Sequence, residues 1–205
     1  MSVVVESNFV LELVLEQEQS SSCVELLTMA EVGAIRLVVP AYSIMEPYET
    51  LGRHHRDRKR IRTDLTNELE QLRRSSSAAV YSQASADVLA LLMESANVET
   101  QRIADLRQRV CAVATIIPLT TDILHGASDY QVQHDLSPQD AVVYASVIAH
   151  LQSDLPAEAC FISRNSSDFD DPDIRAELAS LKCKYLARFD TAVDYLKRPR
   201  RHSTP

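Results

Sequence analysis

Three acidic residues stand in settings that suit metal-dependent chemistry. Glu6 directly follows the apolar run Val3–Val5, Glu46 follows Pro40, and Asp140 lies in the segment Leu-Ser-Pro-Gln-Asp-Ala. If each acid lies where a strand ends or where the next helix runs, the three can converge in one crevice of a parallel sheet. Clustered carboxylates are hard oxygen ligands for Mg²⁺ or Mn²⁺, and such an ion can orient water for phosphodiester hydrolysis. The pattern therefore predicts a nuclease-type site.

Short β-branched runs predict the strands that would position these acids. They are nearly continuous in apolar character, which is typical of strands buried on both faces. The predicted strands are Val3–Val5, Ile35–Val39, Thr115–Pro118 and Cys160–Ser163, with Lys184–Leu186 as an edge strand. The predicted helices between them are Asn8–Glu16, Cys23–Glu31, Thr120–Gln133, Ser137–Gln152 and Asp171–Leu181. Alternating strands and helices predict an α/β fold with a parallel sheet.

A long helical excursion interrupts this alternation between the second and third strands. The pattern predicts one helix through Glu46 to about Arg74, a break at Ser75–Ser77, and a second helix over Ser85–Cys111. The two would form an inserted antiparallel hairpin. We therefore expect a single domain over residues 1–196 with a helical insertion at about 50–110, followed by a basic tail, 197–205.

Composition limits the class of protein. The 205 residues are 45% hydrophobic and 24% charged, which fits one globular domain, and the net charge of −8 argues against broad non-specific adhesion to nucleic acid. The four cysteines form no C-x-x-C pair and are expected to be buried and reduced. Neither a signal peptide nor an apolar run of membrane-spanning length is evident, so we expect a soluble cytoplasmic protein with no membrane partner.

The order and surroundings of the acids resemble a PIN domain. The resemblance rests on Glu6, Glu46, Asp140 and the segment Phe161–Phe169, and it covers most of the chain outside the helical insertion. It implies a three-layer α/β/α fold around a parallel sheet and, in active members, cleavage of RNA that depends on Mg²⁺ or Mn²⁺. Small members are often toxins whose site is covered by a partner peptide, so an antitoxin-like protein partner and a homodimer are also implied.

The resemblance assigns roles by position. It implies catalytic roles for Glu6, Glu46, Asp140 and Asn165, metal ligation by Glu6, Glu46, Asp140 and Asp168, and supporting roles for Asn8 and Ser163. Two positions depart from the family pattern, because Glu6 is one methylene longer than the usual Asp and Asn165 offers a neutral amide where a carboxylate is usual. Two interpretations stay open: a metal-dependent endoribonuclease, or a degenerate scaffold that binds RNA or protein without catalysis.

Structural roles compete with catalytic ones at two of the acids. Ser137 and Asp140 have the spacing of a helix capping box, with Pro138 at the first helical position. Glu46 precedes Pro47, which we expect to kink the helix or to force its start, and a glutamate on a helix face is commonly just solvated. A helical interaction protein with incidental acids is therefore a third interpretation.

A basic stretch stands out in this acidic chain and is the candidate RNA-binding face. Its members are Arg53, Arg56, Arg58, Lys59, Arg60 and Arg62. Such side chains neutralise phosphates and make affinity depend on salt. The alternative is a solvated helix in which these charges pair with Asp64, Glu68 and Glu70 at helical spacing. The histidines lack the spacing of a helical zinc site and are expected to be incidental.

Overall fold

The computed structural model describes residues 1–72, 74, 82–154 and 158–198. Its residues group into two compact units, one formed by Met1–Glu46 with Leu106–Pro205 and the other by Pro47–Asp105. The predicted break at Ser75–Ser77 and the predicted tail beyond Arg198 lie outside the described residues. Among the described helices, none is both long and apolar enough to cross a membrane.

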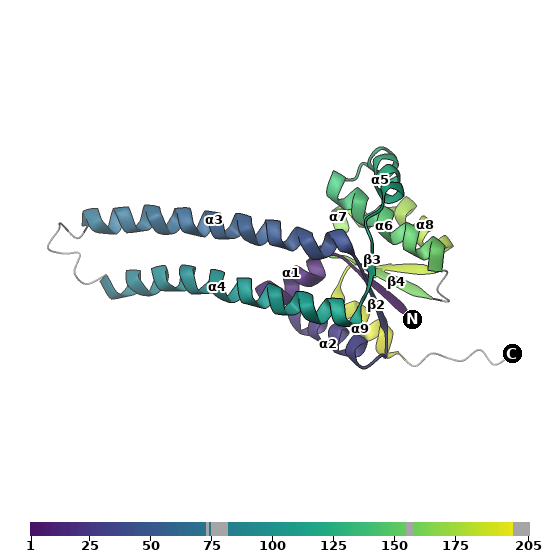
Figure 1. The fold of residues 1–205 in the computed structure, drawn as a ribbon, viewed down its shortest axis with the longest axis horizontal. Coiled ribbons are helices and arrows are strands. Elements are labelled where there is room, and N and C mark those ends of the chain that lie inside the picture. The colour runs from purple at the N-terminus through teal and green to yellow at the C-terminus, as the bar shows by residue number, and fades with distance from the viewer. Residues whose placement is uncertain (73, 75–81, 155–157, 199–205) are drawn as a thin grey trace. The chain divides into compact units, whose positions relative to one another are not determined.

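The first unit is built on one five-stranded sheet (Figure 1). Its strands are β1 (Ser2–Val5), β2 (Arg36–Pro40), β3 (Thr115–Ile117), β4 (Ala159–Ile162) and β5 (Cys183–Leu186). They pair in parallel in the order β3-β2-β1-β4-β5, so β1 is central and β3 and β5 are the edges. Since every crossover between parallel strands needs a return segment, helices separate all five strands.

Helices cover both faces of this sheet, which makes the three-layer α/β/α fold that the sequence predicted. They are α1 (Ser7–Leu15), α2 (Ser20–Glu31), α5 (Thr121–His134), α6 (Pro138–Asp154), α7 (Ser166–Phe169), α8 (Pro172–Ser180) and α9 (Phe189–Lys197). Helices α5 to α8 pack on one face, against the row formed by Val38, Val4, Phe161 and Tyr185. Helices α1, α2 and α9 lie on the other face (Figure 1).

The sheet is buried on both faces, as its continuous apolar strands predicted. Val3, Val4 and Val5 are all fully buried, although successive side chains of a strand point to opposite faces. Parallel pairing brings the carboxyl ends of β1, β2 and β4 to one edge of the sheet. The segments that follow these three strands therefore emerge together and carry Glu6, Glu46, Asn165 and Asp168, whereas Asp140 comes from the start of α6.

The second unit consists of most of the helical insertion. Helices α3 (Ala41–Leu72) and α4 (Ser82–Val113) supply it. Leu51 and Ile103 are buried in this unit, and so is the carboxylate of Glu99. Glu99 accepts hydrogen bonds from Arg58 at 2.7 Å and contacts His55 at 3.0 Å, which links the two helices through charge as well as apolar packing.

Several sequence predictions need correction. Helix α3 begins at Ala41, six residues before Pro47, so the proline does not start it; the boundary between the two compact units does fall at this proline. Helices α7 and α9 were not predicted, and Lys197 ends α9 rather than opening a tail. Cys23, Cys160 and Cys183 are buried free thiols as expected, whereas Cys111 is exposed.

Candidate active site

Glu6 lies at the junction of β1 and α1. It is the N-cap of α1, with an extended backbone, and its Oε2 accepts a hydrogen bond from the backbone N–H of Asn8 at 2.8 Å. This bond satisfies one of the free N–H groups at the helix start. The carboxyl group is therefore held in one orientation by the same chain turn that carries Asn8.

Burial strongly perturbs this carboxyl group. Glu6 is 5% exposed, and its pKa is raised to about 7, mainly by desolvation and to a smaller extent by the nearby Glu46 carboxylate. Asn8 and the Ser163 hydroxyl lower the pKa of Glu6 but do not offset burial. Its second oxygen, Oε1, is buried without a hydrogen-bond partner. A buried acid with an unsatisfied oxygen is typical of a group kept for a ligand rather than for stability.

Glu46 approaches Glu6 from the beginning of α3. This helix starts directly after β2, so Glu46 lies in its second turn, close to the carboxyl edge of the sheet. Ser7, the residue after Glu6, donates a short hydrogen bond from its hydroxyl to Oε2 of Glu46. The two glutamates thus form one acidic group joined through Ser7.

Asp140, Asn165 and Asp168 form a second polar group. The side-chain amide of Asn165 donates to Oδ1 of Asp140 at 3.0 Å and to Oδ2 of Asp168 at 2.6 Å. Burial raises the pKa of Asp140, the hydrogen bonds from Ser137 and Asn165 lower it, and the neighbouring Asp168 carboxylate raises it again. The uncharged amide of Asn165 therefore bridges two carboxylates that still repel each other.

Only half of the capping box predicted at Asp140 is present, because the backbone N–H of Ser137 forms no hydrogen bond with the side chain of Asp140. The backbone N–H of Asp140 donates to Oγ of Ser137 at 3.1 Å, while the Ser137 hydroxyl donates to Oδ2 of Asp140 at 2.5 Å. This leaves Oδ1 turned toward Asn165. The structural role and the proposed role in the site use different oxygens, so they are compatible.

Ser163 connects the two acidic groups. This fully buried residue follows β4, beside β1 in the sheet; its hydroxyl lies next to Glu6 and accepts the backbone N–H of Asn165 at 3.0 Å. Its carbonyl accepts a hydrogen bond from the Tyr185 hydroxyl at 3.0 Å. The predicted supporting residue Ser163 is thus fixed from two sides and lies between Glu6 and the Asn165 group.

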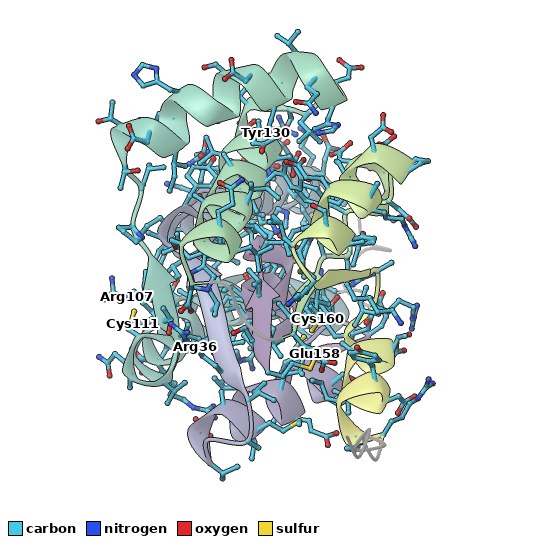
Figure 2. All side chains as sticks on the ribbon, turned by 90° about the vertical axis from the view of Figure 1, so that its right-hand side faces the viewer. Arg36, Arg107, Cys111, Tyr130, Glu158 and Cys160 are labelled. Carbon is cyan, nitrogen blue, oxygen red and sulfur yellow. The ribbon has the colours of Figure 1, made fainter. Side chains whose placement is uncertain are left out.

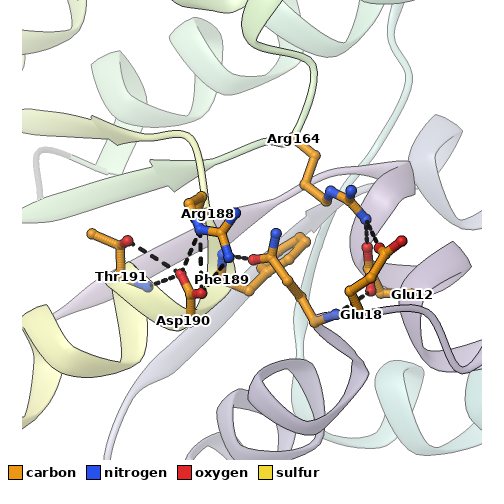
Figure 3. A network of polar contacts seen from close by, with 8 residues as sticks. Glu12, Glu18, Arg164, Arg188, Phe189, Asp190 and Thr191 are labelled. Carbon is orange, nitrogen blue, oxygen red and sulfur yellow. Dashed lines mark hydrogen bonds and ion pairs between the residues drawn. The ribbon is translucent and has the colours of Figure 1, made fainter.

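An ion pair between an exposed arginine and a buried glutamate anchors the loop that carries Asn165. Arg164 forms a short ion pair with Glu12 of α1, a fully buried carboxylate, and also contacts Glu18 at 3.1 Å (Figure 3). Glu12 accepts the backbone N–H of Gln19 at 2.9 Å, and Gln19 in turn accepts the N–H of Phe189 at 2.7 Å. This network joins α1, the loop after β4 and the start of α9.

Sequence reasoning missed Glu12, Arg164 and Ser7. A signal for Glu12 was available, because it is the one charged residue in the apolar helix sequence Ser-Asn-Phe-Val-Leu-Glu-Leu-Val-Leu of α1. A charge in such a helix needs a buried partner. No comparable signal identified Arg164 as that partner, since the two residues are distant in sequence.

The side-chain oxygen atoms of the two acidic groups are the potential ligands of a divalent ion. Carboxylate and amide oxygens are suitable ligands for Mg²⁺ or Mn²⁺, and Oε1 of Glu6 is an oxygen without a partner. Among the described residues, no group of three or more His, Cys, Asp or Glu side chains is close enough to hold one ion in this arrangement. The chemistry of the donors fits a divalent ion, and the side chains are grouped as Glu6 with Glu46 and as Asp140 with Asn165 and Asp168.

The basic stretch lies in the Pro47–Asp105 unit on α3. Arg53, Arg56, Lys59 and Arg60 are exposed, and within the described part of the chain they form no ion pair, so the alternative in which they pair with Asp64, Glu68 and Glu70 is not supported. Arg62 is half-buried and likewise forms no ion pair with a described residue. Arg58 differs, because its guanidinium binds Glu99 and Ser95.

Comparisons with known proteins complete the description of the site. A family model described as PIN domain matches residues 3–169, which include every residue of both acidic groups. Among curated proteins, none matches the sequence.

Proposed function

Since this chain belongs to the PIN domain family, a nuclease-type superfamily, we propose that it is a metal-dependent endoribonuclease that hydrolyses phosphodiester bonds of RNA in the cytoplasm. The observation that carries the proposal is the pair of acidic groups at the carboxyl edge of the sheet, with a buried, unpartnered oxygen on Glu6. A buried oxygen without a hydrogen-bond partner lowers the free energy of unfolding of the protein. A bound cation would recover that free energy.

The divalent ion of this family would be held by Glu6, Glu46 and Asp140, with Asp168 as a further acid, once the two acidic groups draw closer together than they are in this arrangement. When bound, Mg²⁺ or Mn²⁺ supplies a Lewis acid for the phosphoryl oxygens and lowers the pKa of water. The acidic side chains would hold the ion in position. Ser7 orients Glu46, and the backbone N–H of Asn8 orients Glu6, so neither acid has to lose much conformational freedom when the ion arrives.

Asn165 and Ser163 have positioning roles in this proposal. Asn165 holds Asp140 and Asp168 together while the ion is absent, and Ser163 fixes the backbone of Asn165 beside Glu6. An amide can turn its oxygen toward a cation after rotation about its terminal torsion. Contact of Asn165 with a cation would therefore replace its two hydrogen bonds to Asp140 and Asp168.

Contact with RNA is proposed for the exposed cations of α3. Arg53, Arg56, Lys59 and Arg60 have no competing acidic partner among the described residues, so their charge is available to phosphates. Arg58 is excluded from this role because its guanidinium stabilises the buried Glu99 carboxylate. Arg62 stays in the proposed set.

A second candidate function is favoured by Asn165 itself. Its amide already bridges Asp140 and Asp168, so this group is stable without a cation. The protein would then be a scaffold that binds RNA or a protein partner, and it would not turn over RNA. The two functions differ in a measurable way, since only the first requires divalent ions.

The deciding experiment is cleavage of labelled single-stranded and hairpin RNAs with Mn²⁺, Mg²⁺ or EDTA. The wild type is compared with Asp140→Asn and with Asp129→Asn, a control in which an exposed acid of α5 is neutralised. Cleavage that requires metal, disappears in Asp140→Asn and persists in Asp129→Asn supports the endoribonuclease. RNA binding without cleavage in the wild type supports the scaffold, and equal cleavage by all three proteins indicates a contaminating nuclease.

A further inference from the structure

An open pocket of about 700 Å³ lies between β3, α5 and α6. Figure 2 looks onto this side of the molecule and labels two of its lining residues, Arg36 on β2 and Tyr130 on α5. None of the acids of the candidate active site lines this pocket. Its volume is in the range that accommodates a small organic ligand.

The pocket exists because the facing helices carry small residues. Gly126 of α5 and Ala145, Ala149 and Ser153 of α6 line it, and the three α6 residues recur every fourth position along one side of the helix. A Cβ atom on Gly126 would lie 3.9 Å from Cβ of Ala145, an ordinary contact that the fold could accept. Ile117, Ile123 and Ile148 add apolar lining.

His150 supplies an unsatisfied polar atom among these lining residues. It is 8% exposed, and its Nε2 is buried without a hydrogen-bond partner; the nearest acidic oxygen, Oδ2 of Asp154, is 3.7 Å away. Burial lowers the pKa of His150, Asp154 raises it and Arg36 lowers it, so the ring is neutral at pH 7. A neutral imidazole nitrogen in a pocket offers one directed hydrogen bond to a ligand.

The charges of the lining exclude an anionic ligand. Arg36 is already engaged, because it donates to Oγ1 of Thr115 at 3.1 Å and forms a short ion pair with Asp154. Asp122 also lines the pocket and has no cationic partner among the described residues. With one arginine and two aspartates, the lining carries one net negative charge, which disfavours phosphates and carboxylates.

We propose that this pocket binds an uncharged planar nitrogen heterocycle of nucleobase size, with one ring edge on His150 and its faces against the isoleucines. The Arg36–Asp154 ion pair uses Nη1 of Arg36 and Oδ2 of Asp154, so Nη2 and Oδ1 have no partner among the described residues and offer an adjacent donor and acceptor that match the mixed edge of a base. The apolar lining accepts a flat ring, and the open mouth leaves room for a sugar. A free nucleoside and a base of a bound RNA strand present the same ring chemistry.

The test is titration of the metal-free protein with each of the four ribonucleosides. Calorimetry measures the binding, and NMR monitors the methyl resonances of Ile117, Ile123 and Ile148. Ribose 5-phosphate, which has no base, is the negative control. At least one nucleoside should bind and shift these three methyl resonances. Absence of binding at millimolar nucleoside, or shifts confined to other residues, overturns the proposal. Neither readout involves cleavage, so the result is independent of the proposed nuclease.

Variants of the pocket test which residues contribute to nucleoside binding. His150→Leu should weaken nucleoside binding at least tenfold, Ala149→Phe should abolish it by filling the pocket, and His125→Leu, at an exposed histidine outside the pocket, should leave it unchanged. Unchanged affinity in both pocket variants would also overturn the proposal. If either variant unfolds, the methyl shifts of the wild type still decide.

A final experiment distinguishes a free nucleoside from a base of a bound RNA strand as the ligand of the pocket. Short RNA is bound to Asp140→Asn protein with and without Ala149→Phe. A loss of RNA affinity in the double variant assigns the pocket to a base of the strand. Equal RNA affinity, together with lost nucleoside binding, assigns it to a free nucleoside.

Discussion

Replacing Glu6 by glutamine should stabilise the metal-free protein, and the gain should grow with pH. The pKa of Glu6 is raised from 4.5 to about 7 by burial, so the native protein binds the proton more tightly than the unfolded chain does. Below pH 4.5 the acid is neutral in both states and costs nothing. As pH rises from 4.5 to 7 the unfolded chain ionises first, and native stability falls; above pH 7 the loss is constant.

The size of this destabilisation follows from the two pKa values of Glu6, 4.5 in the unfolded chain and about 7 in the native protein. Their difference, at about 1.36 kcal/mol per pH unit, corresponds to about 3 kcal/mol of destabilisation at pH 8. Glutamine keeps the shape and can accept the N–H of Asn8, but it does not ionise. The difference in unfolding free energy between Glu6→Gln and wild type should therefore rise by roughly 2–3 kcal/mol between pH 4.5 and pH 8.

Urea unfolding in EDTA across this pH range measures the unfolding free energies of wild type and Glu6→Gln. Ionisable groups common to both proteins contribute equally to the two values, so they cancel in the difference. Glu49→Gln, which removes an exposed acid from α3, is the matched control and should run parallel to wild type at every pH. Adding Mn²⁺ at pH 8 should then stabilise wild type and not Glu6→Gln, because a ligand of the native state raises stability by mass action. Parallel curves for wild type and Glu6→Gln in EDTA would refute the reasoning from burial.

Asn165→Asp should raise affinity for Mn²⁺ by tenfold or more, measured by calorimetry, since it adds a third carboxylate between Asp140 and Asp168; unchanged affinity would place Asn165 outside the metal site. Arg164→Met should cost about 3–5 kcal/mol in unfolding free energy, because it leaves Glu12 buried and unpaired, and adding Glu12→Leu should restore most of it; an additive double variant would contradict the pairing. Arg56→Gln should reduce the dependence of log affinity for RNA on log salt by about 0.7–0.9, as expected for one lost phosphate contact, in a filter-binding series; an unchanged slope would remove this arginine from the RNA surface.

The sequence predicted the sheet well because its strands carry their own signal. Val3–Val5 is a run of β-branched residues that only a strand buried on both faces explains, and parallel pairing then brings Glu6 and Asn165 to one edge. Glu46 and Asp140 follow from the helices that leave that edge. Glu6, Glu46 and Asp140 were predictable from local pattern combined with one rule of topology, whereas Asn165 was assigned by the family resemblance.

Other features depended on partners that local pattern does not reveal. Arg58 looked like part of a basic face, but the acid that binds it, Glu99, lies on the following helix of the chain. His150 looked incidental, and only packing of α6 leaves its Nε2 buried and unpaired. Helix α9 was missed although it is amphipathic. It begins soon after the edge strand β5, and its N-cap residue Arg188 makes no side-chain capping hydrogen bond that would mark the helix start.

The central place of β1 has a consequence for synthesis of the protein. This strand is made first, yet its neighbour β4 is encoded about 150 residues later, with Val4 paired to Phe161. Pairing at this sequence separation has a high contact order and forms slowly. A nascent chain carries Glu6 and Glu46 out of the ribosome well before Ser163 and Asn165 exist. The two acidic groups therefore cannot be joined until Ser163 and Asn165 have been synthesised, long after Glu6 and Glu46.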